Sequence, residues 1–386
     1  MKYHFNERIM PHETSAKWHW YLDDEDVIPM WVADMDFAAP VEVKRELKKR
    51  IDEGVFGYTI EPDSYFDAII QWQGINFGWK LDREWIVSSP GVITSLNVTI
   101  QAFSSPGDNI LVQTPVYHSF YDCVFINNRN IIKNPLKLVE DQYEIDFDDL
   151  EQVLRKHDVK IFLLCNPHNP TGKVYKDSEL RQLATLCRDY NVLMIADEIH
   201  QDLIYSEYQH TTLGLLTNLY DNIVVLNSPT KSFNMAGLKV SNTIIPSTQL
   251  REKYILQRKK NGPTSINLFG ILACEVAYAG GETWLRQVMG YIENNRNYAL
   301  QYLKSFLPEL RAIAPQGTYF LWVDCSNLCL VGSELEDFFI KRARIRVSNG
   351  VTFGSEGERF IRLNIACPFK LLEKALYSLH NAVRSR

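Results

Sequence analysis

Short apolar runs rich in β-branched residues recur along the first two thirds of the chain, and each is followed by a polar turn. Buried strands are predicted at 84–88, 109–113, 160–164, 192–196, 223–226 and 240–245. Helices are predicted between several of them, at 41–53, 63–76, 92–103 and 178–190. Strands that alternate with helices are typical of an α/β fold with a large, doubly wound, mostly parallel sheet.

The pattern changes after Pro263. Two long helices are predicted at 266–279 and 283–306, followed by strand-like segments at 318–323 and 360–365. A chain of 386 residues is long enough to divide into two domains. We therefore predict three parts: a large α/β domain, a smaller α+β domain, and an N-terminal arm that joins the small domain. Their expected bounds are 41–284, 285–386 and 1–40, respectively.

Charge and hydropathy exclude several classes of partner. The net charge is −6 and the isoelectric point is near 5.9, so nothing favours binding to nucleic acid or to an anionic membrane. No apolar run approaches the length of a transmembrane helix, and the first residues lack the apolar core of a signal peptide. We expect a cytoplasmic protein.

The seven cysteines favour neither disulfides nor a metal site. They are odd in number and form no CxxC pair, and the closest two, Cys325 and Cys329, have no histidine beside them. Reduced thiols are the expectation for a cytoplasmic chain.

Polar side chains follow three of the predicted parallel strands. Asn166 comes soon after strand 160–164, Asp197 directly after strand 192–196, and Lys231 shortly after strand 223–226. In doubly wound sheets, ligands bind outside the carboxyl ends of the strands. Hydroxyls and a lysine at such an end suit a cofactor that carries a phosphate and an aldehyde, because the hydroxyls bind phosphate and the amine reacts with the carbonyl.

A glycine turn adds a second candidate anion site. Strand 84–88 runs through Ser89-Pro90-Gly91 into helix 92–103. The first N–H groups of a helix have no partner within the helix, so the backbone amides of Gly91, Val92 and Ile93 could hold a phosphate. Taken alone, such a turn is more often a simple connection, and a lysine in a loop is more often a surface charge.

Five motifs together are specific. They are WVADMDF at 31–37, NPHNPTG at 166–172, DEIH at 197–200, SPTKSFNMAGLK at 228–239 and RLNIACP at 362–368. In combination they resemble the fold-type I pyridoxal-phosphate enzymes of the class I/II aminotransferase superfamily. Within it, the chain is similar to the cystathionine β-lyase or cysteine-S-conjugate lyase branch called MalY/PatB. The resemblance covers essentially the whole chain.

The resemblance implies pyridoxal 5′-phosphate as cofactor and assigns a role to each motif residue. Lys231 would bind the cofactor covalently, Asp197 would pair with the ring nitrogen, Asn166 would contact the ring hydroxyl and the substrate, and Tyr117 would stack on the ring. The phosphate would be held by Ser228, Lys239 and the amides of Gly91, Val92 and Ile93. The superfamily usually has arginine where this chain has Lys239, which keeps the charge but loses the two-pronged hydrogen bond.

Three further residues are assigned in the same way. Arg362 would bind the substrate α-carboxylate as a two-point clamp. Tyr58 would reach across the interface of a homodimer to the phosphate and substrate of the neighbouring subunit. Many aminotransferases have a tyrosine three residues after the aspartate, where this chain, like the lyase branch, has His200. We expect His200 to orient Asp197.

Three functions remain open on these residues. The first is a lyase that cleaves the C–S bond of L-cystathionine or another S-substituted L-cysteine. The second is an aminotransferase that uses an amino acid and a 2-oxo acid, because both reactions share every step up to loss of the α-proton. The third is a non-catalytic regulator on this fold, which is disfavoured because the chain has no basic helix-turn-helix stretch and keeps Lys231.

Overall fold

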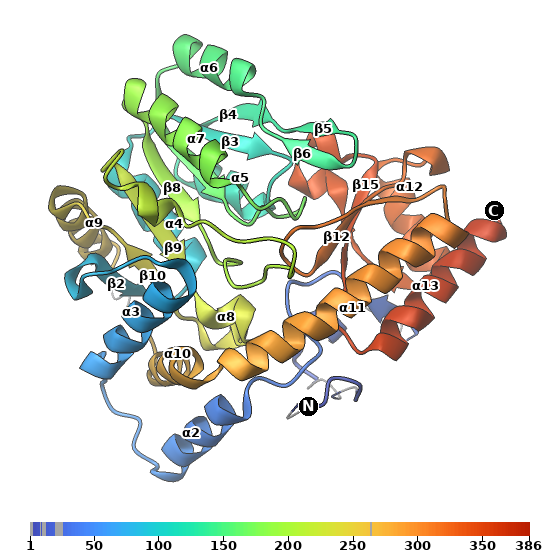
Figure 1. Ribbon diagram of the computed structural model, residues 1–386, viewed down its shortest axis with the longest axis horizontal. Helices are drawn as coiled ribbons and strands as arrows, with labels where there is room; N and C mark the ends of the chain where they lie inside the picture. The colour runs from blue at the N-terminus through green and yellow to red at the C-terminus, as the bar shows by residue number, and fades with distance from the viewer. Residues whose placement is uncertain (1–2, 8, 10–12, 20–25, 263–264) are drawn as a thin grey trace.

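The computed structural model describes residues 3–7, 9, 13–19, 26–262 and 265–386, and its core is a seven-stranded sheet (Figure 1). The strand order is β2-β10-β9-β8-β7-β3-β4. The strands are β2 (Ile86–Ser89), β3 (Asn109–Thr114), β4 (Asn130–Pro135), β7 (Val159–Cys165), β8 (Leu193–Asp197), β9 (Ile223–Asn227) and β10 (Ser241–Ile244). Strand β10 runs antiparallel to β2 and β9, and every other pair in this sheet is parallel. The α/β fold with a mostly parallel sheet is confirmed.

Both faces of the central strands are buried, because successive side chains of a strand point to opposite faces. In β7, Ile161 and Leu163 belong to one apolar cluster, whereas Phe162 and Leu164 belong to another. Helices α4 (Val92–Phe103) and α9 (Thr248–Lys260) pack against each other, and α4 also contacts β7, β9 and β10. Helix α7 (Asp177–Asp189) contacts β8, and α6 (Phe147–Lys156) contacts β4.

Three helices of the region around the large sheet have nearly the bounds predicted from the sequence. Helix α4 has the expected bounds, and α3 (Asp63–Phe77) and α2 (Val41–Asp52) end within a residue of theirs. Several elements here were not predicted: β4, α5 (His118–Ile126), α6, α9, and the hairpin of β5 (Lys137–Val139) and β6 (Gln142–Glu144). The strands of that hairpin are only three residues long, too short to give a readable alternation.

A second, four-stranded antiparallel sheet lies in the C-terminal third of the chain, in the order β11-β12-β15-β14. Its strands are β11 (Arg311–Ile313), β12 (Phe320–Asp324), β14 (Ser348–Asn349) and β15 (Phe360–Asn364). Helix α10 (Leu268–Gly280) leads into α11 (Glu282–Phe306), which runs alongside α13 (Phe369–Arg384) (Figure 1). The division of the chain stays a prediction, and its boundary after residue 284 would fall inside α11.

The N-terminal arm pairs with the C-terminal part of the chain. Strand β1 (Ile28–Pro29) lies parallel to β13 (Ile345–Arg346), and the N–H of Asp36 donates to the carbonyl of Ala366 at 2.9 Å. All seven cysteines are free, and only Cys329 is exposed. Over the residues described above, none of the helices is both long and apolar enough to cross a membrane.

A tight turn between β14 and β15 of the small sheet packs against the segment that follows β3 of the large sheet. The short helices η6 (Gly350–Phe353) and η7 (Ser355–Gly357) pack against each other. The carbonyl of Phe353 accepts hydrogen bonds from the N–H of Val116 at 2.8 Å and from the hydroxyl of Tyr121 at 3.0 Å. A Cβ atom at position 350 would overlap the main-chain oxygens of Gly357 and Phe360. The approach of these backbones therefore requires glycine.

We expect Gly350→Ala to lower the free energy of unfolding by about 1–3 kcal/mol, because the backbone atoms that a methyl group would meet cannot move without disturbing the turn. The matched control is Gly290→Ala in α11, where a Cβ atom meets nothing within 4 Å. That variant should gain about 0.5–1 kcal/mol from the lost backbone freedom of the unfolded chain. Thermal unfolding midpoints of both variants test this, and equal midpoints would contradict it.

Candidate active site

Three neighbouring parallel strands bring the site together at their carboxyl ends. Asp197, the last residue of β8, lies opposite Cys165 of β7 and Leu226 of β9. Strand β9 is followed by Ser228 and by the single-turn helix α8 (Pro229–Ser232), which carries Lys231. The geometry expected from the strand pattern is therefore present: the groups that follow separate strands meet at one edge of the sheet.

A cavity of about 260 Å³ opens at this edge. It includes eight of the predicted site residues: Gly91, Val92, Ile93, Tyr117, Asp197, His200, Lys231 and Lys239. Residues that the sequence reasoning missed also line it: Ala33, Pro90, Thr94, Cys165, Asn169, Ile199, Thr230, Ala236 and Val240. Five of these lie inside motifs that were singled out, so their positions in the sequence were a usable signal: Ala33, Asn169, Ile199, Thr230 and Ala236.

The glycine turn forms the expected helix N-terminus. Gly91 is the N-cap of α4. Its φ is 143°, a backbone conformation that residues other than glycine rarely adopt. The amides of the first turn face no helical acceptor, so an anion in the cavity would meet them. Lys239, in the left-handed region with φ of 53°, lines the same cavity and adds a positive charge.

Ser228 does not line this cavity. Its hydroxyl donates to the carbonyl of Val240 at 2.6 Å and accepts from the N–H of Thr230 at 3.1 Å, as the N-cap of α8. Thr230 lines the cavity, and its hydroxyl lies 2.7 Å from that of Ser228. Ser228 therefore shapes the turn that carries Thr230.

Lys231 is placed by the N-terminal arm. Its Nζ donates to the carbonyl of Ala33 at 2.6 Å. Burial lowers the pKa of the Lys231 amine to about 8, a shift that the carboxylate of Asp34 opposes and the guanidinium of Arg362 reinforces. An amine with a pKa close to neutrality can react as a nucleophile or act as a base.

Asp197 is a buried carboxyl group with one hydrogen bond to the backbone. Its Oδ1 accepts from the N–H of Ile199 at 3.1 Å, and burial raises its pKa to about 7. No ion pair to Asp197 is found among the described residues. A cationic partner in the cavity would remove the cost of burying this charge.

His200 also lines the cavity. Burial lowers the pKa of its imidazole to about 3, helped by the charges of Lys231 and Arg362, so the ring is neutral. Its Nδ1 is buried without a hydrogen bond, and its ring lies edge-on to Phe320. Oδ1 of Asp197 accepts from the N–H of Ile199, and the orienting role expected of His200 stays a prediction.

The asparagine that faces the cavity is Asn169, not Asn166. The side chain of Asn166 bonds to two other segments: Nδ2 donates to the carbonyl of Thr211 at 3.1 Å, and Oδ1 accepts from the N–H of Tyr175 at 3.4 Å. Both asparagines precede a proline in NPHNPTG, so the sequence pattern alone could not separate them. Asn169 Oδ1 instead accepts from Nη1 of Arg362 at 2.9 Å.

Arg362, from β15, lies behind Asn169. Its Nη2 donates to the carbonyl of Trp31 at 2.8 Å, and its guanidinium stacks 4.0 Å from the ring centre of Phe320. Burial lowers the pKa of Arg362 to about 10, and its Nε is buried without a hydrogen bond. The residue is therefore a buried cation bonded to neutral oxygen atoms, a state that a carboxylate ligand would improve.

Two further predicted residues differ in position. Tyr117 precedes α5 and lines the cavity, as expected of a residue that contacts a ring. Tyr58 is fully exposed and lies in the loop between α2 and α3, outside the cavity.

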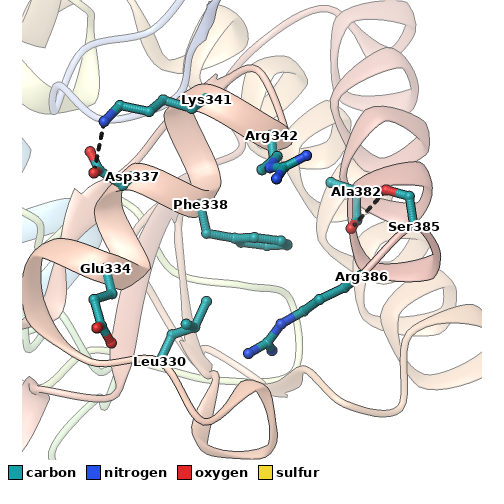
Figure 2. A pocket seen from close by; sticks show the side chains of 9 residues that line it. All are labelled: Leu330, Glu334, Asp337, Phe338, Lys341, Arg342, Ala382, Ser385 and Arg386. Carbon is teal, nitrogen blue, oxygen red and sulfur yellow. Dashed lines mark hydrogen bonds and ion pairs between the residues drawn. The ribbon is translucent and has the colours of Figure 1, made fainter.

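Figure 2 shows a separate hollow of about 330 Å³ on the C-terminal part, between the segment that holds Phe338 and the end of α13. It contains none of the predicted site residues, and Lys341 there pairs with Asp337 at 2.8 Å. Over the same described residues, no group of three or more His, Cys, Asp or Glu is placed to hold a metal ion.

Comparisons with known proteins agree with this geometry. Residues 25–379 match the family model described as aminotransferase class I and II. The chain is 40% identical to cystathionine beta-lyase PatB of Bacillus subtilis (strain 168) over 359 residues, 93% of each chain. It is 32% identical to the protein MalY of Escherichia coli (strain K12), with 99% of each chain covered.

A solved structure gives the same result. Cystalysin from Treponema denticola, whose structure contains pyridoxal 5′-phosphate, superposes with a TM-score of 0.96 at 31% identity over the whole of both chains. The resemblance to fold-type I enzymes and to their MalY/PatB branch is confirmed. The chain belongs to the class I and II aminotransferase family.

Proposed function

We propose that the protein is a pyridoxal-phosphate-dependent β-lyase that cleaves the C–S bond of L-cystathionine or other S-substituted L-cysteines to a thiol, pyruvate and ammonia. The observation that carries the proposal is the meeting of Lys231 and Asp197 in one cavity beside a helix N-terminus. The 40% identity to a relative named cystathionine beta-lyase supports the choice of reaction. The expected cytoplasmic location stays a prediction from the sequence.

The cavity suits the cofactor at both of its ends. The amides that begin α4, the Thr230 hydroxyl and Lys239 would hold the phosphate. At the other end, the buried carboxyl of Asp197 has no ion pair among the described residues, and a protonated ring nitrogen would supply one. With that partner bound, the pKa of Asp197 would fall below about 7, so the carboxylate would keep the proton on the ring nitrogen.

When bound, pyridoxal phosphate supplies an electron sink for the bond electrons of the substrate α-carbon. Lys231 would hold the aldehyde end covalently until the amino group of the substrate replaces it. The freed amine of Lys231, with its pKa lowered to about 8 by burial, would then remove the α-proton. Tyr117 would pack against the ring and Asn169 would contact its hydroxyl.

Arg362 would bind the α-carboxylate of the substrate. Its Nη1 and Nη2 atoms now donate to Asn169 and Trp31, so a carboxylate would join or replace these neutral acceptors with a charged one. Fixing the carboxylate also fixes which bond of the α-carbon lies next to Lys231.

Loss of the α-proton leaves two possible outcomes. If the β-carbon carries a thiolate leaving group, its C–S bond breaks, and water then converts the remaining three-carbon unit to pyruvate and ammonia. If a proton is returned to the cofactor instead, the amino group stays behind and a 2-oxo acid is needed to complete the cycle. The lyase and the aminotransferase therefore differ in their need for an added oxo acid.

We further propose that the active form is a homodimer in which Tyr58 contacts the phosphate of the partner subunit. The loop between α2 and α3 exposes four large apolar or aromatic side chains: Val55 at 67%, Phe56 at 60%, Tyr58 at 112% and Ile60 at 80%. Such a patch on one loop favours burial against another chain.

The purified holoenzyme should release pyruvate and free thiol from L-cystathionine with no oxo acid present. Lys231→Ala should lower this rate at least about 100-fold, because the base that removes the α-proton is lost. Coupled assays for pyruvate and thiol measure both. Turnover that appears only after a 2-oxo acid is added would reject the lyase in favour of the aminotransferase.

The two asparagines of NPHNPTG should give different phenotypes. Asn169→Ala should shift the visible absorbance of the bound cofactor and raise KM, because it removes a cavity contact and one partner of Arg362. Asn166→Ala should instead cost about 1–3 kcal/mol of stability, since it leaves a buried carbonyl without its donor. Absorbance spectra and thermal midpoints of both variants test this. An unchanged spectrum in Asn169→Ala would restore Asn166 as the candidate.

Ile60→Glu should weaken the homodimer, because it places a charge in the exposed apolar loop. Ile126→Glu is the matched control, an isoleucine exposed to 76% at the end of α5. Sedimentation velocity over a range of concentrations measures the effect. A wild-type protein that stays monomeric with cofactor bound would contradict the proposal, as would a loop variant that dimerises normally.

A further inference from the structure

The helix that carries Lys231 is too short to fix its own orientation. Helix α8 has four residues, and isolated helices of that length are unstable in water. Contacts at its two ends must therefore hold it. At its start, the hydroxyl of Ser228 donates to the carbonyl of Val240 at 2.6 Å. The direction of the Lys231 side chain then depends on what holds the other end.

The end of α8 is held by the carboxylate of Asp202. The hydroxyl of Ser232, the residue after Lys231, donates to Oδ2 of Asp202 at 2.5 Å. The indole N–H of Trp72, from α3, donates to Oδ1 of the same carboxylate at 2.9 Å. The ring of Trp72 lies edge-on to that of Phe233, with the ring centres 5.7 Å apart. One carboxylate therefore contacts the first residue after Lys231 directly and the second through Trp72.

Asp202 belongs to the segment that follows Asp197. Two backbone hydrogen bonds of 2.9 Å close tight turns over residues 198–201 and 200–203, so the segment is compact. These turns place the carboxylate of Asp202 relative to the end of β8. Beyond the ends of β8 and β9, its bond to α8 joins the segment of Asp197 to the segment of Lys231.

We propose that Asp202 is a positioning residue, which holds α8 so that the amine of Lys231 is correctly placed relative to Asp197. This inference rests on the proposed function, in which Lys231 removes the α-proton. Proton transfer is sensitive to displacements of about 1 Å, so loss of the bond from α8 to Asp202 should lower kcat. The substrate carboxylate would be bound by Arg362, from β15, so KM should change little.

The chemistry of the two hydrogen bonds defines the variants. Asparagine can keep both contacts, because its oxygen accepts from Trp72 and its NH₂ group donates to the Ser232 hydroxyl, which can rotate to accept. Asp202→Ala removes both, and Ser232→Ala removes one. Asp202 also lines a hollow of about 220 Å³ with Tyr208, which is 40% exposed. Water can therefore fill the space that alanine leaves.

The test is steady-state pyruvate release from L-cystathionine by the holoenzymes, with visible circular dichroism of the bound cofactor. Asp202→Ala should lower kcat about 10- to 100-fold, with KM within about twofold and an altered dichroism band. Asp202→Asn should keep most of the wild-type kcat. The double variant Asp202→Ala/Ser232→Ala should be no slower than Asp202→Ala, because both substitutions remove the same bond.

Asp324→Ala is the matched control in the small sheet, since its carboxylate also accepts from a serine hydroxyl, that of Ser326 at 2.5 Å. It should lower the thermal midpoint and leave kcat and the dichroism band unchanged.

The outcomes separate the role of Asp202 from the function itself. A wild-type kcat in Asp202→Ala would overturn the positioning role, as would Asp202→Asn as slow as the alanine variant, or a further loss in the double variant. If Asp202→Ala does not fold, a wild-type kcat in Ser232→Ala overturns it equally. Pyruvate release that persists in Lys231→Ala would instead overturn the proposed function.

Discussion

Burial of both faces of the central sheet is the constraint on which the rest of the structure depends. Strands β7, β8 and β9 have side chains in two apolar clusters, so few positions along them tolerate a polar group. Chemistry is confined to the residues at and beyond their carboxyl ends. Because the three strands are parallel and adjacent, the residues that follow them lie side by side at one edge of the sheet. Asp197 is the last residue of β8, and the four residues before it are apolar.

The same constraint explains how much could be predicted from the sequence. An uninterrupted apolar run that stops at a charged residue marks a buried strand and its end, so Asp197 and Lys231 were recognisable. The glycine turn before α4 was readable because a tight turn and a helix start leave local signatures. These signals lie within a few residues of the groups concerned, and the structure needed only to bring the strands together.

The predictions that needed correction depend on contacts between distant segments. Asn166 and Asn169 have the same local sequence environment, and only Thr211, Tyr175 and Arg362 distinguish them. The contact expected of Tyr58 across a dimer interface stays a prediction, because a single chain leaves its loop exposed. The contact of Ala33 with Lys231 spans 198 positions in the chain. The pattern of apolar and polar residues along the chain contains no signal for a contact over that separation.

Helix α11 connects the region of the site lysine with the C-terminal part. It contains 25 residues without interruption, which corresponds to a rod of about 38 Å. Near its start the ring of Trp284 lies 6.1 Å from that of Phe233, two residues after the site lysine, and its far end packs with α13. Between these ends, Asn295 donates to the carbonyls of Ile365 and Cys367, so the helix is attached along its length. The turn that carries Lys231 and the helices of the C-terminal part are therefore connected through one straight element.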